Sequence, residues 1–464
     1  MENKQTLLRR LPGVDHILEL IKKDTRFTDI PLNVTKSSAR YVLENIRNNI
    51  LNNNKVDIVE DRIIETISRH ALKEAKNNLI GVINATGVVM HTNLGRSLLC
   101  KEALKNITQI ASGYSNLEYN IEKGSRGIRY SAVEDLICEL TGAESAIAVN
   151  NNAGAVLLSL NSIAEGKEVI VSRGELVEIG GSFRIPDVMT KSNAILKEVG
   201  TTNRTHAHDY SRAISDNTGL FLKVHTSNYK IEGFTSSVSI ADLKLIGKEH
   251  GIPVMEDLGS GTLLDFTKYG LGSEPTIKDS VKSGADIISF SGDKLLGGPQ
   301  TGIIVGKKEI IDMIKSNPLT RALRIDKLTL AALEATLRLY RDEENIVKKI
   351  PTLKMLTDSY SNIKKRALTL MKKLEPFLPK NVEIKLADLY SRPGGGSFPS
   401  LKLPSCCITI KSKYISAANL EKKLRNNDTP IIGRIEDDRF VLDPRTIQKG
   451  EDKIICQTLI AILN

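Results

Sequence analysis

The chain has few cysteines and no long apolar segment. Its five cysteines are odd in number and show no CxxC spacing. This pattern indicates neither a disulfide framework nor a zinc site, so we expect buried thiols and no bound metal. No window approaches about 18 uninterrupted apolar residues, and charged residues stand where a signal peptide would need its apolar region. We therefore expect a cytoplasmic protein that does not contact a membrane.

Aromatic side chains are also scarce, at 4% of 464 residues, whereas the formal net charge is +10. An excess of positive charge points to an anionic partner. Half of this excess lies in residues 341–380, which hold ten Lys/Arg and five Asp/Glu. Aromatic residues are not interleaved with these cations in the pattern that stacks bases, and no RNP-type motif occurs. Charge alone leaves two interpretations open, a solvated helix face and an RNA-facing patch.

Hydrophobic periodicity divides the chain into three regions. Residues 1–75 show apolar residues at helical spacing and predict a small helical domain. Within residues 76–330, apolar strand-like runs alternate with amphipathic helices, which predicts an α/β domain with a mostly parallel sheet flanked by helices. Residues 331–464 begin with a long helical connection, to about residue 376, and continue as a smaller α+β domain.

A lysine follows one of the predicted strands of the α/β region. In "SFSGDKLLGGPQTG", Ser289 to Gly302, an apolar strand ends just before Lys294 and a glycine-rich turn comes after it. Open α/β sheets bind their ligands at the carboxyl ends of strands. A turn lysine that points into water is the alternative for this residue taken alone.

Two further segments favour a cofactor site around that lysine. Asp257 ends the strand in "IPVMEDLGSG". An aspartate and a lysine at strand ends are what pyridoxal phosphate requires, because the lysine forms a Schiff base and the aspartate holds the ring nitrogen protonated. In "AIAVNNNAGAVLLSL", a helix that begins near Asn152, Ala153 and Gly154 offers free N–H groups to a phosphate. Together they predict a fold-type-I pyridoxal phosphate enzyme.

Other cofactor classes fit the sequence less well. No GxxxxGK[ST] motif occurs, and no GxGxxG follows a strand, so a phosphate-loop NTPase is not indicated. His225 in "KVHTSNYK" ends a strand and is a candidate for contact with the cofactor. A strand-end histidine bonded to other protein groups explains it equally well.

Six motifs extend over nearly the whole chain. They are "INATGVVMHTNLGRSLL" (83–99), "SRGELVEIGGSFRIPDVM" (172–189), "EDLGSG" (256–261), "SFSGDKLLGGPQTGIIVGKKE" (289–309), "RALRIDKLTLAALEATLRLY" (321–340) and "IIGRIEDDRFVLDPRT" (431–446). These motifs resemble the family of bacterial selenocysteine synthases, the L-seryl-tRNA(Sec) selenium transferases.

The resemblance implies a reaction and residue roles. L-seryl-tRNA(Sec) becomes L-selenocysteyl-tRNA(Sec) with selenophosphate as donor, through an aminoacrylyl-tRNA bound to pyridoxal 5'-phosphate. Lys294 is the natural base for the Cα proton, and Asp293 is a candidate acid for the departing hydroxyl. The family's anion-binding arginines match Arg96, Arg321 and Arg324. The last two share a face if their segment is helical.

The resemblance also implies partners. The family forms a ring-shaped homodecamer, a pentamer of dimers, and its N-terminal domain, here residues 1–75, selects tRNA(Sec). The segment with Arg96 is expected to reach the site of a partner subunit. We expect neither DNA nor a membrane as partner.

Two alternatives remain open on the sequence. The first is a related pyridoxal phosphate lyase that acts on a free small amino acid or amino sugar; it would have no use for the helical N-terminal region. The second is a non-catalytic RNA-binding protein built on the same fold. The pair Lys294 and Asp257 speaks against the second, because a binding protein gains nothing from keeping both.

Overall fold

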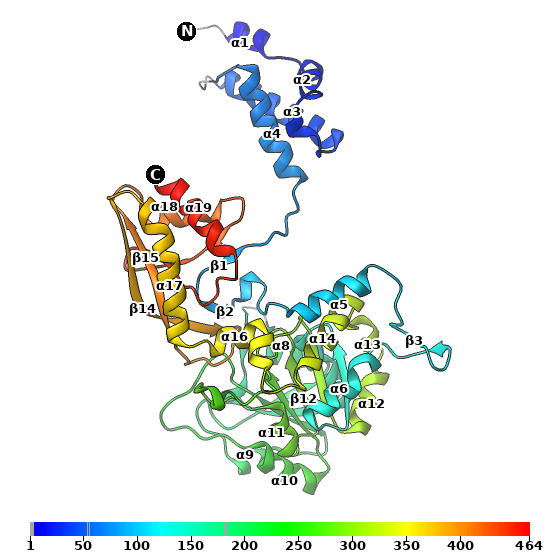
Figure 1. Cartoon of the computed structure of the whole chain (residues 1–464). Coiled ribbons are helices and arrows are strands. Elements are labelled where there is room, and N and C mark those ends of the chain that lie inside the picture. The colour runs from blue at the N-terminus through cyan, green and yellow to red at the C-terminus, as the bar shows by residue number, and fades with distance from the viewer. Residues whose placement is uncertain (1–3, 53, 55, 181–182) are drawn as a thin grey trace. The chain divides into compact units, whose positions relative to one another are not determined.

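The structure is a computed structural model that describes residues 4–52, 54, 56–180 and 183–464. It comprises two compact units, Met1–Gly81 and Val82–Asn464, which we call the N-terminal unit and the main unit. Figure 1 shows both. We expected the first boundary near residue 75, where helix α4 ends; the compact units instead divide after Gly81.

The N-terminal unit is helical, as its apolar spacing predicts. It contains α1 (Lys4–Arg10), α2 (Val14–Ile21), α3 (Leu32–Leu51) and α4 (Glu60–Ala75), with a 3-10 turn at Thr25–Phe27. Ile17, Val42, Ile63 and Ile67 form part of its buried core. Because one stripe of α2, α3 and α4 is apolar, these helices bury the stripes against one another and leave their charged faces outside, whereas α1 has no buried residue.

A seven-stranded sheet organises the main unit. Its order is β5 (Ser145–Val149), β13 (Gly302–Gly306), β12 (Ile287–Ser291), β11 (Val254–Gly259), β10 (Thr218–Val224), β6 (Glu168–Ser172) and β9 (Ile195–Val199). Strand β13 runs antiparallel to both of its neighbours, and the other pairs in this sheet are parallel. The predicted α/β class with a mostly parallel sheet is therefore confirmed. The edge strand β9 was missed, because "ILKEV" has no continuous apolar run.

Helices cover both faces of this sheet, so successive strand residues enter different cores. Phe221 packs into the layer with α6 (Ser131–Thr141), α10 (Ile240–His250) and α14 (Lys327–Leu339), whereas Leu220 and Leu222 pack into the layer with α7 (Asn152–Ala164), α8 (Ile185–Lys191) and α12 (Lys308–Ser316). Burial on both faces is typical of parallel sheets and explains the apolar runs in the sequence.

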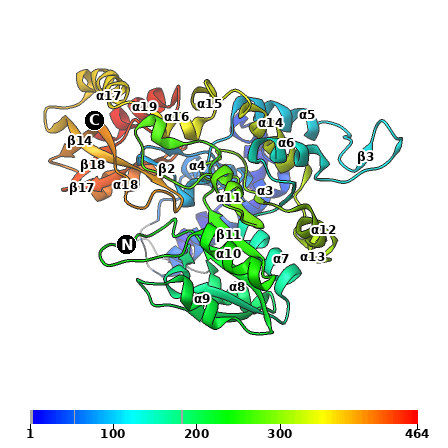
Figure 2. The same ribbon diagram turned by 90° about the horizontal axis from the view of Figure 1, so that it is seen from below.

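A second sheet lies in the C-terminal region. Its order is β17 (Arg434–Glu436), β18 (Arg439–Leu442), β15 (Leu403–Ser412), β14 (Val382–Gly394) and β2 (Val88–Met90), and β1 (Ile83–Asn84) pairs with β16 (Ile431–Ile432). Around it lie α17 (Tyr360–Leu374), α18 (Ala417–Arg425) and α19 (Glu451–Leu463). Figures 1 and 2 show α17 beside β14.

Two boundaries of this region differ from the sequence-based expectation. Residues 83–90, which we grouped with the α/β domain, pair with C-terminal strands. The helical connection is also not continuous, because it breaks into α14, α15 (Ile346–Lys349), α16 (Pro351–Thr357) and α17. Pro351 explains one break, since proline is tolerated at the start of a helix and not inside it.

The remaining elements are short or peripheral. The helices are α5 (Lys101–Ala111), α9 (Ala207–Ala213), α11 (Ile277–Lys282) and α13 (Leu319–Ala322), the strands are β3 (Tyr119–Asn120), β4 (Ser125–Arg126), β7 (Glu178–Ile179) and β8 (Phe183–Arg184), and the 3-10 turns are Thr92–Leu94, Arg173–Glu175, Phe266–Tyr269 and Glu375–Phe377. The segment around β3 projects away from the sheet in both views (Figures 1 and 2).

Candidate active site

Asp257 and Lys294 lie at the carboxyl ends of neighbouring strands. Asp257 belongs to β11 and is 1% exposed, and Lys294 follows β12 and is 5% exposed. The strand register pairs Asp257 with Ser289, whose hydroxyl donates to Asp257 Oδ1 at 2.9 Å. The same oxygen accepts from Asn152 Nδ2 at 2.9 Å and from the backbone N–H of Gly259 at 3.2 Å. Three donors thus converge on one oxygen of this buried carboxyl group.

The environment of Lys294 favours a neutral amine. Burial lowers the pKa of Lys294, and the positive charge of Arg96 acts in the same direction, while the negative charges of Asp257 and Asp293 oppose it. A neutral amine is the form that attacks a carbonyl carbon. A lysine in this position is therefore suited to covalent chemistry rather than to a surface ion pair.

The start of α7 approaches the same strand ends. The side chain of Asn151 caps the helix by accepting from the N–H of Gly154 at 2.8 Å. The N–H groups of Asn152 and Ala153 precede the first hydrogen bond within the helix, so they can bind an anion. Gly154 is buried; a Cβ there would lie 3.0 Å from Asn150 Oδ1 and 3.2 Å from Leu323 Cδ2, so it packs inward.

Unpaired buried polar atoms next to this group fit a bound cofactor. Asn152 Oδ1 and Ser227 Oγ are buried without a hydrogen-bond partner among the described residues. A Cβ on Gly259, which has φ +61°, would lie 3.4 Å from Ser227 Oγ and 4.0 Å from Lys294 Nζ. Buried polar atoms are normally bonded, so these atoms indicate a missing polar partner. The residues suit a group with an aldehyde, a ring nitrogen and a phosphate.

His225 lies beside Asp257 but has a protein partner of its own. Its backbone N–H donates to the carbonyl oxygen of Asp257 at 2.9 Å, and its Nε2 lies 2.8 Å from Glu274 Oε2. The ring keeps 25% exposure. Sequence reasoning missed Glu274, which lies in an irregular loop between the turn at Phe266–Tyr269 and α11 and carries no motif signal of its own.

Arg96 and Asp293 form an ion pair next to Lys294. Arg96 Nη1 donates to Asp293 Oδ2 at 2.6 Å, and the Ser97 hydroxyl approaches the carbonyl oxygens of Asp293 at 2.8 Å and Lys294 at 2.9 Å. Arg96 has φ +61°, a left-handed conformation that non-glycine residues rarely adopt. The segment that carries Arg96 therefore braces the lysine turn.

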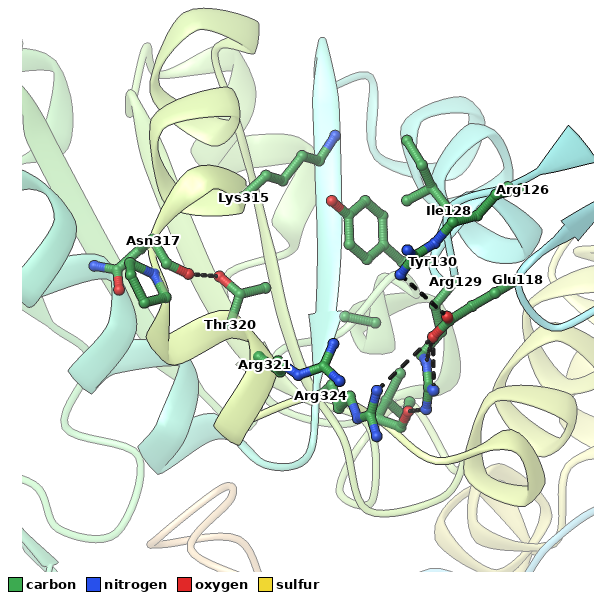
Figure 3. A pocket seen from close by; sticks show the side chains of 14 residues that line it. Glu118, Arg126, Ile128, Arg129, Tyr130, Lys315, Asn317, Thr320, Arg321 and Arg324 are labelled. Carbon is green, nitrogen blue, oxygen red and sulfur yellow. Dashed lines mark hydrogen bonds and ion pairs between the residues drawn. The ribbon is translucent and has the colours of Figure 1, made fainter.

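Arg321 and Arg324 line a different pocket, which Figure 3 shows. A shared face requires a continuous helix, but α13 ends at Ala322, and Arg324 forms a backbone bridge with Val149 of β5. Arg126, Arg129, Tyr130 and Lys315 also line this pocket. Arg96 lines another pocket, together with Asp293 and Gln300.

Glu118 is the acidic residue around which these arginines gather. Arg129 donates to Glu118 Oε1 from Nε at 2.9 Å and from Nη2 at 2.7 Å, and Arg324 Nη1 lies 3.9 Å from the same oxygen (Figure 3). Arg129 is the main reason that the pKa of Glu118 is lowered. Sequence reasoning missed both residues, because the loop before α6 carries no recognisable motif.

Comparison with known proteins assigns the sequence to a family. The profile of the L-seryl-tRNA selenium transferase family matches residues 82–448. The chain belongs to this family. It is 50% identical to an L-seryl-tRNA(Sec) selenium transferase of Alkaliphilus metalliredigens over 98% of this chain and 99% of that protein. It is also 50% identical to one of Geobacter metallireducens, over the same shares of both chains.

A solved structure supports the fold assignment. The chain is similar to D-glucosaminate-6-phosphate ammonia-lyase, with a TM-score of 0.57, 21% identity, and coverage of 83% of this chain and 96% of that one. At this identity the likeness concerns the fold, and it agrees with the fold-type-I expectation for this member of the selenium transferase family.

We expect Lys294 to carry the cofactor. Lys294→Ala removes the buried amine, so the purified protein should lose its visible absorbance band and its activity while remaining folded. Borohydride reduction of the wild-type protein, followed by peptide mapping, should label Lys294. Lys308→Ala is a matched control, because Lys308 is 68% exposed. A label on another lysine contradicts the assignment.

We expect Asp257→Asn to separate cofactor binding from turnover. Asparagine keeps an oxygen that accepts from Asn152 and Ser289, but it has no charge to hold a proton on a ring nitrogen. The variant should retain cofactor and lose activity by about a hundredfold or more, the size of a typical acid–base contribution. Absorbance and turnover measure the two properties separately. Near-normal turnover counts against this role.

Proposed function

We propose that this protein converts L-seryl-tRNA(Sec) to L-selenocysteyl-tRNA(Sec) with pyridoxal 5'-phosphate as cofactor and selenophosphate as selenium donor. The observation that carries the proposal is the buried pair of Lys294 and Asp257 at neighbouring strand ends, in a chain that belongs to the selenium transferase family. Incubation of the purified protein with seryl-tRNA(Sec) and selenophosphate tests it. Selenocysteine esterified to the tRNA is the expected product.

The cofactor would be held by groups that the main unit already gathers. Lys294 would bind its aldehyde carbon, Asp257 its ring nitrogen, and the N–H groups of Asn152 and Ala153 at the start of α7 its phosphate. His225 and Gly154 are the remaining residues that we assign to the cofactor site. When bound, pyridoxal phosphate supplies an electron sink for the charge that develops at Cα of serine.

The protein side chains then have defined tasks. Lys294, with its lowered pKa, accepts the Cα proton of serine as a neutral amine. Asp257 would keep the ring nitrogen protonated. We assign protonation of the departing serine hydroxyl to Asp293, which is 5% exposed and adjacent to Lys294. The ion pair with Arg96 holds this carboxyl group beside the lysine turn.

We assign selenophosphate to Arg96, Arg321 and Arg324. Arginine suits a small polyanion, because its forked donors stay charged and bind oxygen pairs. Two of the three line the cationic pocket of Figure 3. Arg96 lines a different pocket, which is compatible with a site completed by a second subunit. A homo-oligomer, in the form of a ring-shaped decamer built from five dimers, is part of this proposal.

A basic cleft supports RNA binding by the main unit. The cleft is ≈ 950 Å³ and is lined by eight Lys/Arg and three Asp/Glu. Lys354, Lys365 and Arg366 come from the basic segment 341–380, whereas Lys101 and Lys449 come from distant parts of the chain. Phosphate groups of a nucleic acid backbone are bound by such clusters of cations. We infer that this cleft assists the N-terminal unit in docking tRNA(Sec).

The two alternative functions gain no specific support. The ammonia-lyase likeness concerns the fold alone, so it does not favour a free amino acid or amino sugar as substrate. A purely RNA-binding role does not explain why the amine of Lys294 is buried.

No described helix is long and apolar enough to span a membrane. The proposed site of action is the cytoplasm.

We expect the arginines to act on the donor and not on elimination. Arg321→Ala and Arg324→Ala should each raise the KM for selenophosphate by about tenfold or more, the effect of losing about 1.4 kcal/mol of binding. Arg96→Ala should do the same. Loss of the serine hydroxyl without donor should persist. Arg338→Ala is the control, because Arg338 pairs with Glu334 on the surface of α14. If elimination disappears as well, the arginines act earlier in the reaction.

We expect residues 1–75 to contribute to RNA affinity. Deletion of this segment removes neither Asp257, Lys294 nor the start of α7, so cofactor absorbance should not change. Affinity for tRNA(Sec) should fall, and the dependence of log affinity on log salt should become shallower by about 0.7–0.9 for each phosphate that the segment neutralises. Equal affinity with an unchanged slope would mean that the segment has a structural role only.

A further inference from the structure

Glu274 joins two parts of the main unit that come together at the lysine site. Its carboxylate is 5% exposed. One oxygen, Oε2, lies 2.8 Å from Nε2 of His225, and the other, Oε1, accepts from the backbone N–H of Phe398 at 2.8 Å. The first partner follows strand β10 of the large sheet, and the second follows strand β14 of the C-terminal sheet. A single carboxylate thus bridges the two sheets.

The segment that Glu274 holds has a strained backbone. Gly394, Gly395 and Gly396 have φ values of +76°, +65° and +68°, and Phe398 has φ +50°. The left-handed conformation is unfavourable for a residue with a side chain, so fixed contacts must hold Phe398 in place. Its ring is buried edge-to-face on Phe266, with centroids 5.3 Å apart, and its N–H is bonded by Glu274.

This segment, residues 394–398, forms part of the wall of the lysine site. A Cβ on Gly396 would lie 3.4 Å from Cβ of Asn228 and 3.9 Å from Ser227 Oγ. Ser227 Oγ in turn lies close to Gly259, as Lys294 Nζ does. Ser227 Oγ and Ser397 Oγ are both buried without a partner among the described residues. Glu274 therefore fixes the wall on the side of the site where Ser227 Oγ and Ser397 Oγ lie.

The chemistry of the bridge also determines which nitrogen of His225 carries a hydrogen. An ionised carboxylate only accepts hydrogen bonds, so His225 must donate from Nε2. In neutral His225, Nδ1 is then left as an acceptor. A carboxylate behind a histidine fixes both the orientation of the ring and its tautomer in this way.

We propose that Glu274 is a positioning residue, which orients His225 at the cofactor site and couples it to the wall formed by residues 394–398. The measurements of kcat described below rest on the proposed function. Glu274 itself touches neither Lys294 nor Asp257 in any contact among the described residues. Its effect on the reaction passes through His225 and the wall.

Glu274→Gln is the decisive variant, because it changes the hydrogen bond to His225 and keeps the one from the backbone N–H of Phe398. The amide oxygen still accepts from Phe398, whereas the amide nitrogen faces His225 and forces the hydrogen of the imidazole onto Nδ1. Hydrogen exchange of the Phe398 amide in the cofactor-free protein should stay slow in Glu274→Gln and become faster in Glu274→Ala. The circular dichroism of the bound cofactor should change in both variants, with cofactor content retained in Glu274→Gln.

The activity arm uses a double-mutant cycle with His225→Phe. Glu274→Gln should lower kcat by about tenfold or more in the wild-type background and by less than about twofold in the His225→Phe background, because its effect passes through the histidine. Glu232→Gln is the control, since Glu232 is exposed and pairs with Lys230. Equal losses in both backgrounds, or unchanged circular dichroism in Glu274→Gln, overturn the proposal. Absence of selenium transfer in the wild-type protein would contradict the proposed function and leave the exchange and dichroism tests valid.

Discussion

The burial of an amine beside a carboxylate is the constraint on which the main unit depends. Lys294 and Asp257 are almost completely buried, and each would be costly there alone. Three donors stabilise the Asp257 carboxylate, and Asp257 in turn opposes the effect of burial on the pKa of Lys294. The pair therefore depends on the register of β11 and β12 and on the start of α7, which bring these donors to Asp257.

The architecture around this pair distributes the remaining tasks. The large sheet fixes both groups through the register of β11 and β12. The C-terminal sheet contributes a wall through residues 394–398, and its edge strand β2 leads into the segment with Arg96. Cations occupy the periphery, in the pocket of Figure 3 and in the basic cleft. We thus assign the covalent chemistry to the buried pair Lys294 and Asp257, and anion binding to the outer pocket of Figure 3 and the basic cleft.

Sequence reasoning located the residues whose signals are local. Apolar runs located the strands of the large sheet apart from its edge strand β9, and strand ends then identified Asp257 and Lys294. The pairing of residues 83–90 with C-terminal strands was missed, because contacts across more than 300 residues leave no periodic signal. Glu274 and Glu118 were missed because each lies in an irregular loop without a recognisable motif, and their partners His225 and Arg129 are 49 and 11 residues away in the sequence.

The most direct test of this account is the absorbance of the purified protein during titration with either seryl-tRNA(Sec) or free serine. The account predicts a visible band that arises from Lys294 and the cofactor, and a change of this band with seryl-tRNA(Sec) at concentrations where free serine has no effect. A protein without such a band, or one that responds to free serine and not to the aminoacylated RNA, would contradict it.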